Sequence, residues 1–170
     1  MSYCSGLTRE RIMECAKAEF LKKGFQAAQL KDIVAAAKVT TGAVYRHFKD
    51  KEALFFALIE DVYHYTLDFL DNVESYDTVG IKEAIERDSI ESSYMQAMKY
   101  VNYMYEHFEE YQLLLKCSKG SRVENFIEEI ADQYTKQNAQ FVKAAYEAGY
   151  AKCLPSDIEI HILTHGYITA

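Results

Sequence analysis

The chain has 170 residues, of which 49% are hydrophobic, so it can bury a substantial core. A single proline and seven glycines leave little room for the frequent turns of an all-β fold, which favours long helices. No apolar run approaches the roughly 20 residues that span a bilayer. The four cysteines have no CxxC spacing, and no signal peptide is visible, so we expect a cytoplasmic protein without membrane contact.

The net charge of −7 would by itself argue against a nucleic-acid partner, because phosphate neutralisation needs excess Lys and Arg. The average conceals a partition along the chain. Residues 1–52 hold ten basic and six acidic side chains, whereas the other 118 residues hold nine basic and twenty acidic ones. The asymmetry indicates a basic end that could meet nucleic acid and an acidic body.

The N-terminal third predicts three short helices followed by a long one. The first runs from about Thr8 to Lys23 and is ended by Gly24, and the second has its apolar side at Leu30, Ile33, Val34 and Ala37. Thr40 or Thr41 can cap a third, very short helix, in which Val44 and Phe48 form an apolar pair. Asp50 can cap a fourth helix that is long enough to join two domains.

The remainder also predicts helices. Residues 72–80 look like a connection, and a helix from about Ile81 to His107, with a break near Asp88, precedes a short apolar segment. The capping-box spacing of Ser121 and Glu124 predicts a helix from Ser121 to Gly149. Pro155 suits the first turn of a last helix, which has no closing cap at Ala170, so we expect a truncated C-terminus. The predicted fold class is all-α.

Three short helices with a tight turn between the second and third form a unit whose third helix can enter the major groove of DNA. Small or polar residues are needed where that helix begins, because a bulky side chain would hold the backbone off the DNA. Thr40, Thr41, Gly42 and Ala43 meet this need.

The segment Val39–Leu54, with the spacing Thr-x-Gly-x-x-Tyr-x-x-Phe-x-x-Lys, resembles the DNA-binding domain of the TetR/AcrR family of bacterial regulators. Ala16-x3-Phe20-x3-Gly24-Phe25 and Asp32-Ile33-Val34-x2-Ala37 support the resemblance, which covers about Thr8 to Leu58. Two residues depart from the family pattern. Lys38 stands where many members have a turn glycine, and Gln29 where a threonine usually caps the second helix.

The resemblance implies that Thr41, Gly42 and Tyr45 lie at the DNA surface and that Lys51 contacts phosphate. Arg46 could bind guanine or phosphate, and Tyr45 could instead pack in the core. The candidate DNA-binding residues are Thr40, Thr41, Gly42, Ala43, Tyr45, Arg46, His47 and Lys51.

The same resemblance divides the chain into a helix-turn-helix domain, residues 1–50, and a helical ligand-binding and dimerisation domain, residues 51–170. It implies a homodimer through the last two helices, bound to a palindromic operator in double-stranded DNA. The Tyr- and Met-rich middle helices suit a small apolar or aromatic effector, or could simply be core. The candidate ligand-binding residues are Tyr94, Met98, Tyr103, His107 and Tyr111.

We therefore expect a transcriptional regulator, a repressor that its ligand releases from the operator. The alternative is a ligand-carrying or protein-interaction module whose helix-turn-helix is only structural. We expect no enzyme, because no nucleophile with a base partner and no phosphate-binding loop stands out. Asp157, His161 and His165 share one helical face, as metal ligands could, but histidines at a dimer interface explain the spacing equally, and we expect neither metal nor cofactor.

Overall fold

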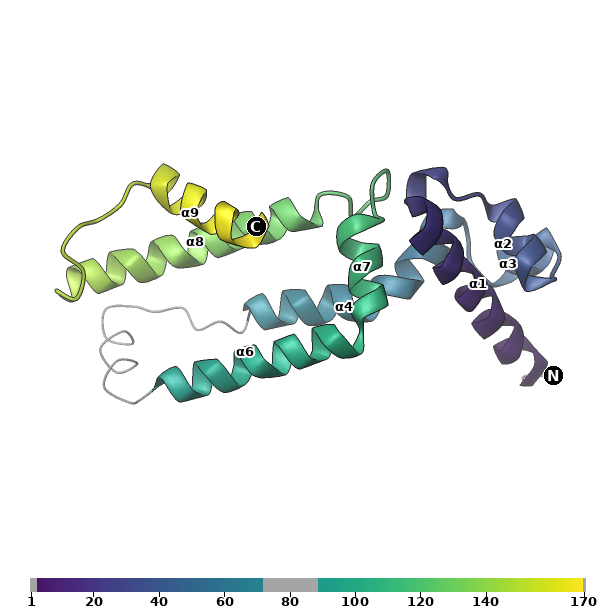
Figure 1. Ribbon diagram of the computed structural model, residues 1–170, viewed down its shortest axis with the longest axis horizontal. Helices are drawn as coiled ribbons and strands as arrows, with labels where there is room; N and C mark the ends of the chain where they lie inside the picture. The colour runs from purple at the N-terminus through teal and green to yellow at the C-terminus, as the bar shows by residue number, and fades with distance from the viewer. Residues whose placement is uncertain (1–2, 72–88, 170) are drawn as a thin grey trace. The chain divides into compact units, whose positions relative to one another are not determined.

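The computed structural model describes residues 3–71 and 89–169, which form eight α-helices and no strand (Figure 1). The expected all-α fold class is confirmed. Residue contacts divide the chain into two compact units, the first made of residues 1–64 with 107–125 and the second of residues 65–106 with 126–170. The first unit thus takes in the start of the fourth helix and a later segment, and the division expected at residue 50 stays a prediction.

The first unit contains α1 (Tyr3–Ala27), α2 (Leu30–Ala37), α3 (Thr41–His47), the beginning of α4 (Lys51–Asp71) and α7 (Phe108–Lys116). Its core is aromatic where α1 meets α4, since the ring of Phe20 lies 5.0 Å from that of Phe55 and 6.0 Å from that of Phe25. Buried aliphatic side chains complete the core: Ile12, Ala16, Ile33, Ala37, Val44, Leu54, Leu58 and Ile59.

Gly24 breaks α1 as expected. Its φ of 72° and ψ of 164° are not helical, and a side chain at that positive φ would be strained. The break turns the chain so that the Phe25 amide donates to the carbonyl of Cys117, at 2.7 Å, just after α7. Gly24 therefore interrupts α1 and lets the last turn of α1 bond to the segment that follows α7.

A polar contact joins α7 to α1 as well. The ammonium of Lys17 reaches Glu110 at 2.5 Å and Glu109 at 3.3 Å. Partial burial opposes ionisation of Glu110, but the hydrogen bond from Lys17 holds the pKa of its carboxyl below the ordinary value. Together with buried Leu113 and Leu114, this ion pair makes α7 part of the first unit.

The second unit contains the end of α4, α6 (Ser89–Glu106), α8 (Phe126–Glu147) and α9 (Asp157–Thr169). The end of α4 is joined to α8 by Gln133, which donates to Asp71 at 2.8 Å, and by Gln137, which donates to the Leu70 carbonyl at 2.8 Å. The α8 and α9 helices lie antiparallel and side by side (Figure 1).

Two helix starts differ from the prediction, and both have a local cause. Ser121 caps a turn instead of a helix, because its hydroxyl accepts from the Val123 amide while Glu124 accepts from the Gly120 amide, and α8 begins only at Phe126. Likewise α9 begins at Asp157, where reciprocal bonds between Ser156 and Glu159 cap its first turn, so Pro155 precedes the helix. The expected end of α8 at Gly149 is confirmed by its φ of 83°.

The predicted connection at 72–80 and the predicted break near Asp88 lie outside the described residues. Among the helices that the structure describes, none is long and apolar enough to cross a membrane.

Candidate nucleic-acid interface

The start of α3 is built by Thr40. This residue is extended, with φ −87° and ψ 154°, and its hydroxyl accepts from the Ala43 amide at 3.2 Å. Thr40 is therefore the N-cap, which the sequence had left open between Thr40 and Thr41. The cap places Thr41 and Gly42 in the first turn of the helix, and both are exposed.

One side of α3 packs in the core, and the other side faces solvent. Val44 and Phe48 are 1% and 4% exposed, whereas the ring of Tyr45 is 54% exposed. Of the two roles considered for Tyr45, the surface position is the one observed. Arg46 is also exposed, and it forms no hydrogen bond or ion pair with any described residue.

Gly42 has no internal reason to be glycine. A Cβ built at this position meets nothing within 4 Å, and its φ is not positive. The space above Gly42 is open to the exterior. A glycine here lets a large partner approach the backbone of α3 closely.

The turn between α2 and α3 has a left-handed residue, Lys38, at the position where the family pattern has glycine. Lys38 has φ 53° and ψ 43°, the left-handed region that costs a non-glycine residue about 1 kcal/mol. The Lys38 and Val39 amides donate to the Ala35 and Val34 carbonyls, so the turn is well bonded. Gln29, at the N-cap of α2, makes no side-chain cap bond.

Ion pairs of Lys23, near the end of α1, hold the first turn of α2 against α1. Lys23 binds Glu19 at 2.6 Å and Asp32, in the first turn of α2, at 2.9 Å. The hydrogen bond from Lys23 holds the pKa of Asp32 below its ordinary value. This network anchors the helix that precedes the turn.

Lys51 turns inward. Its ammonium donates to the carbonyls of Phe25 and Ala28, at 2.8 and 3.1 Å, and lies 4.3 Å from the centroid of the Phe25 ring. The bond from the Ala53 amide to Asp50, at 2.7 Å, confirms the predicted cap of α4. Lys51 thus ties the start of α4 to the α1–α2 connection, a role that sequence reasoning missed.

Basic side chains are common on the exposed surface of this unit. The guanidinium of Arg9 lies 5.3 Å from the centroid of the Phe48 ring, next to the end of α3. His47 is half-buried beside Phe48, with ring centroids 6.4 Å apart. Other exposed basic residues are Arg11, Lys22, Lys31, Lys38 and Lys49.

The structure places the five predicted ligand-binding residues in different surroundings, and their role in ligand binding stays a prediction. Tyr94 and Met98 are exposed on α6, and Tyr103 stacks on Tyr65 with ring centroids 3.7 Å apart. His107 and Tyr111 belong to the other compact unit, where Tyr111 is buried. A groove among the described residues is lined by a different set of side chains.

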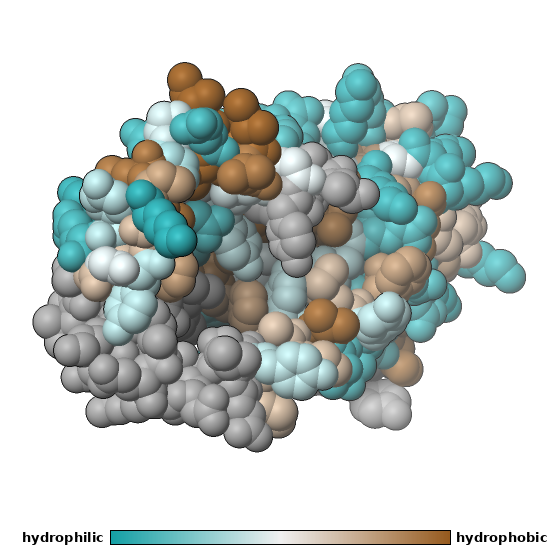
Figure 2. Space-filling view, turned by 60° about the vertical axis from the view of Figure 1, so that its left-hand side comes forward, coloured by the Kyte–Doolittle hydropathy of each residue, from teal (hydrophilic) through white to brown (hydrophobic). Residues whose placement is uncertain are grey.

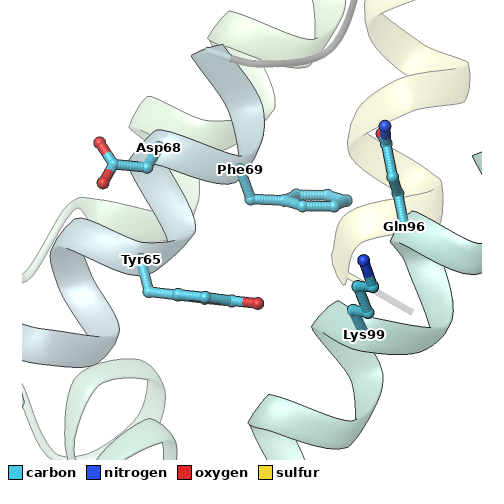
Figure 3. A pocket seen from close by; sticks show the side chains of 5 residues that line it. All are labelled: Tyr65, Asp68, Phe69, Gln96 and Lys99. Carbon is cyan, nitrogen blue, oxygen red and sulfur yellow. The ribbon is translucent and has the colours of Figure 1, made fainter.

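This groove lies between the end of α4 and α6, entirely within the second unit, and has a volume of about 300 Å³. Tyr65 and Phe69 extend from α4 toward α6, and Gln96 and Lys99 extend from α6 (Figure 3). Asp68 completes the lining, but its carboxylate points away from α6. The i, i+4 spacing of Tyr65 and Phe69 was readable in the sequence, but only as part of an apolar helix face.

The outer side of α9 is apolar. Ile158, Ile162 and Leu163 are 72%, 63% and 71% exposed, while Ile160 and Thr164 face α8. Figure 2 shows hydrophobic side chains gathered at the upper edge of this face of the molecule, the edge at which α9 lies in Figure 1. This patch faces solvent in the single chain.

The two histidines of α9 contact α8. His165 bonds to Glu128 at 3.0 Å, and the His161 ring nitrogen lies 3.4 Å from the Thr135 hydroxyl. Within the described ranges, no three His, Cys, Asp or Glu side chains come close enough to hold a metal ion. The histidines therefore act as part of the α8–α9 packing.

Three helices, of which the second and third are joined by a tight turn and the third is capped and exposed, define a helix-turn-helix. Residues 12–58 match the family model described as "Bacterial regulatory proteins, tetR family". The similarity to this family therefore covers the second half of α1, all of α2 and α3, and the start of α4. The resemblance expected from Val39–Leu54 is thereby confirmed.

Relatives match over the same part of the chain. The "HTH-type transcriptional regulator TtgR" of Pseudomonas putida is 42% identical over 73 residues, which are 42% of this chain and 34% of the relative. The "Probable acrEF/envCD operon repressor" of Escherichia coli is 46% identical over 48 residues, 28% of this chain and 22% of the relative. The matches thus span about a third or less of these relatives.

A solved structure agrees over nearly the whole chain. The "Crystal structure of gamma-butyrolactone receptor (ArpA-like protein)" aligns with a TM-score of 0.56 and covers 99% of this chain and 83% of that one. At 21% sequence identity, this similarity supports the shared fold of the helical body.

Proposed function

We propose that this chain is a sequence-specific DNA-binding transcriptional regulator, a repressor that binds a palindromic operator as a homodimer and is released by a small apolar or aromatic ligand. The observation that carries the proposal is the two-sided α3: Val44 and Phe48 anchor it in the core, while Gly42, Tyr45 and Arg46 face outward. A purely structural helix would gain nothing from an exposed tyrosine and an uncovered glycine on that side.

Each exposed residue has a role in this proposal. The first turn of α3, Thr40 to Ala43, enters the major groove, where its small side chains allow close approach. Tyr45 donates its hydroxyl to a phosphate, and Arg46 binds guanine or phosphate. His47 and Lys51 lie nearer the core. In this proposal they stabilise the fold of the helix-turn-helix as well as contacting DNA.

The dimer would form through α8 and α9. Exposed apolar side chains on both helices support this: Phe141, Tyr146, Ile158, Ile162 and Leu163. A two-fold interface of this kind would set the two α3 helices about 34 Å apart, one turn of DNA. The operator is therefore expected to be a palindrome.

The relatives support the regulatory part of the proposal. One carries the name of an operon repressor, and the solved structure with the same fold is that of a receptor for a small molecule, a gamma-butyrolactone. A regulator that acts on chromosomal DNA would work in the cytoplasm, and its effector would bind in the second unit.

The test is selection of an operator from random double-stranded DNA, followed by titration of the selected site by fluorescence anisotropy at several salt concentrations. Tyr45→Ala and Arg46→Ala should each weaken binding about tenfold or more, since a good specific contact contributes about 1–3 kcal/mol. Tyr105→Ala, which removes an exposed tyrosine from α6, should leave binding unchanged.

If no sequence is enriched, or if both α3 variants bind like the unchanged protein, the regulator proposal fails. The alternative, an interaction module with a structural helix-turn-helix, would then account for the chain.

A further inference from the structure

The groove between α4 and α6 has an aromatic wall with a parallel arrangement. The ring of Tyr65 stacks on Tyr103 at 3.7 Å between centroids, and Phe69 stacks on Tyr100 at 4.4 Å, with planes inclined by 21° and 17°. Tyr65 and Tyr100 are parallel within 3°. Tyr100 and Tyr103 already stack on these rings, so the groove offers ring edges, against which an aromatic ligand can pack edge-to-face.

The opposite wall supplies hydrogen-bond donors and a positive charge. Gln96 and Lys99 are three residues apart, so they share one face of α6, and both side chains extend beside the tips of the Tyr65 and Phe69 rings (Figure 3). Neither makes a hydrogen bond or ion pair with a described residue. Their polar atoms are available to a ligand.

Charge distinguishes the possible ligands. The second unit holds fifteen acidic and six basic side chains, which at long range would favour a cation. Within the groove the local charge is positive instead. The Asp68 carboxylate points away from α6, whereas the Lys99 ammonium lies near the ends of the Tyr65 and Phe69 rings. A direct ion pair at contact distance outweighs distant charges, which salt screens beyond about 10 Å.

We propose that this groove binds a planar aromatic acid, whose ring packs edge-to-face against Tyr65 and Phe69 and whose carboxylate accepts hydrogen bonds from Lys99 and Gln96. The volume of about 300 Å³ is at the small end of ligand sites and suits one or two fused rings. Binding of the acid does not depend on the proposed function. The inference rests on the proposed function only where it makes this acid the effector that controls DNA binding.

The experiment is isothermal titration of the full chain with three probes of one shape: 2-naphthoate, 2-naphthamide and 2-naphthylmethylammonium. We expect 2-naphthoate to bind at least tenfold more tightly than the neutral amide, because charge-assisted hydrogen bonds are about twice as strong as neutral ones. Lys99→Met should remove this preference, and Phe69→Leu should weaken all binding while keeping the helix apolar. Lys143→Met, which removes an exposed lysine from α8, should change nothing.

Equal or tighter binding of the amide or the ammonium probe would overturn the proposal, as would binding of 2-naphthoate that survives Lys99→Met, or no binding by a protein whose circular dichroism shows it folded. Operator titration without any probe is run on the same preparation. Lost operator binding with retained 2-naphthoate binding would refute the proposed function alone, and the reverse result would refute the groove alone.

Discussion

Lys51 and Phe25 form a paired contact in which one lysine binds both the backbone and the ring of the same residue. The Lys51 ammonium donates to the Phe25 carbonyl at 2.8 Å while lying 4.3 Å from the centroid of its ring. The cation is thus held where the α1–α2 connection would otherwise leave two carbonyls, those of Phe25 and Ala28, facing the start of α4.

Lys51→Met should therefore destabilise the fold. The variant keeps the alkyl chain but leaves both carbonyls without their charged donor, which should cost about 1.5–3 kcal/mol. A chain of this size would lose about 2–4 °C of melting temperature per kcal/mol. Lys49→Met, at a neighbouring exposed lysine, should change stability by less than about 0.5 kcal/mol.

The same variant tests the phosphate role predicted for Lys51. If Lys51 also contacts phosphate, the slope of log binding constant against log salt concentration should fall in magnitude by about 1 in Lys51→Met. If its role is internal, the slope stays the same at a temperature where the variant is folded. A melting temperature equal to that of the unchanged protein would contradict the internal role.

Lys38→Gly should stabilise the protein by about 1 kcal/mol. Lys38 occupies the left-handed region, where glycine has no Cβ and so no steric penalty. Chemical denaturation measures the change. Ala35→Gly is the matched control, because the same residue placed inside α2 should cost about 0.5–1 kcal/mol. If Lys38→Gly lowered the free energy of unfolding as Ala35→Gly does, the turn would not strain Lys38.

The Lys17–Glu110 ion pair should make stability depend on acid pH. The pKa of Glu110 is lowered in the folded chain, so the unfolded chain binds the proton more readily. The contribution of the pair is present above the ordinary glutamate pKa of about 4.3 and is lost as the pH falls through the lower folded value. Denaturation at pH 6 and pH 3.5 should show a smaller pH effect in Glu110→Gln.

For this pair the size of the effect is about 1 kcal/mol or less, as for other partly exposed ion pairs. Glu106→Gln, at an exposed position on α6, should keep the full pH dependence of the unchanged protein. An unchanged pH dependence in Glu110→Gln would mean that the ion pair does not contribute to stability.

Ile162→Glu should dissociate the proposed dimer. The side chain is 63% exposed on the outer face of α9, and a carboxylate there would have to be buried against the partner without a counter-charge. Sedimentation velocity should show a monomer for this variant. Val101→Glu, the same kind of change at an exposed site on α6, should remain dimeric; a dimer in both variants would place the interface elsewhere.

The sequence by itself determined the helix-turn-helix, because its signals are local. Thr40 and Asp50 cap neighbouring amides, Gly24 has the backbone freedom that the break requires, and apolar side chains at helical spacing mark the buried faces. Lys38 stands where the family pattern has a turn glycine, and its left-handed conformation fits that local signal. These features depend on residues within a few positions of one another.

Only the tertiary structure decided what depends on distant residues. Lys51 meets Phe25 across 26 positions, Lys17 meets Glu110 across 93, and the groove unites Tyr65 with Lys99. Composition suggested a Tyr- and Met-rich site, but it could not tell that Tyr111 is core or that Tyr94 faces solvent. Helical periodicity gives the face of a residue on its own helix, whereas packing decides which other helix, or solvent, that face meets.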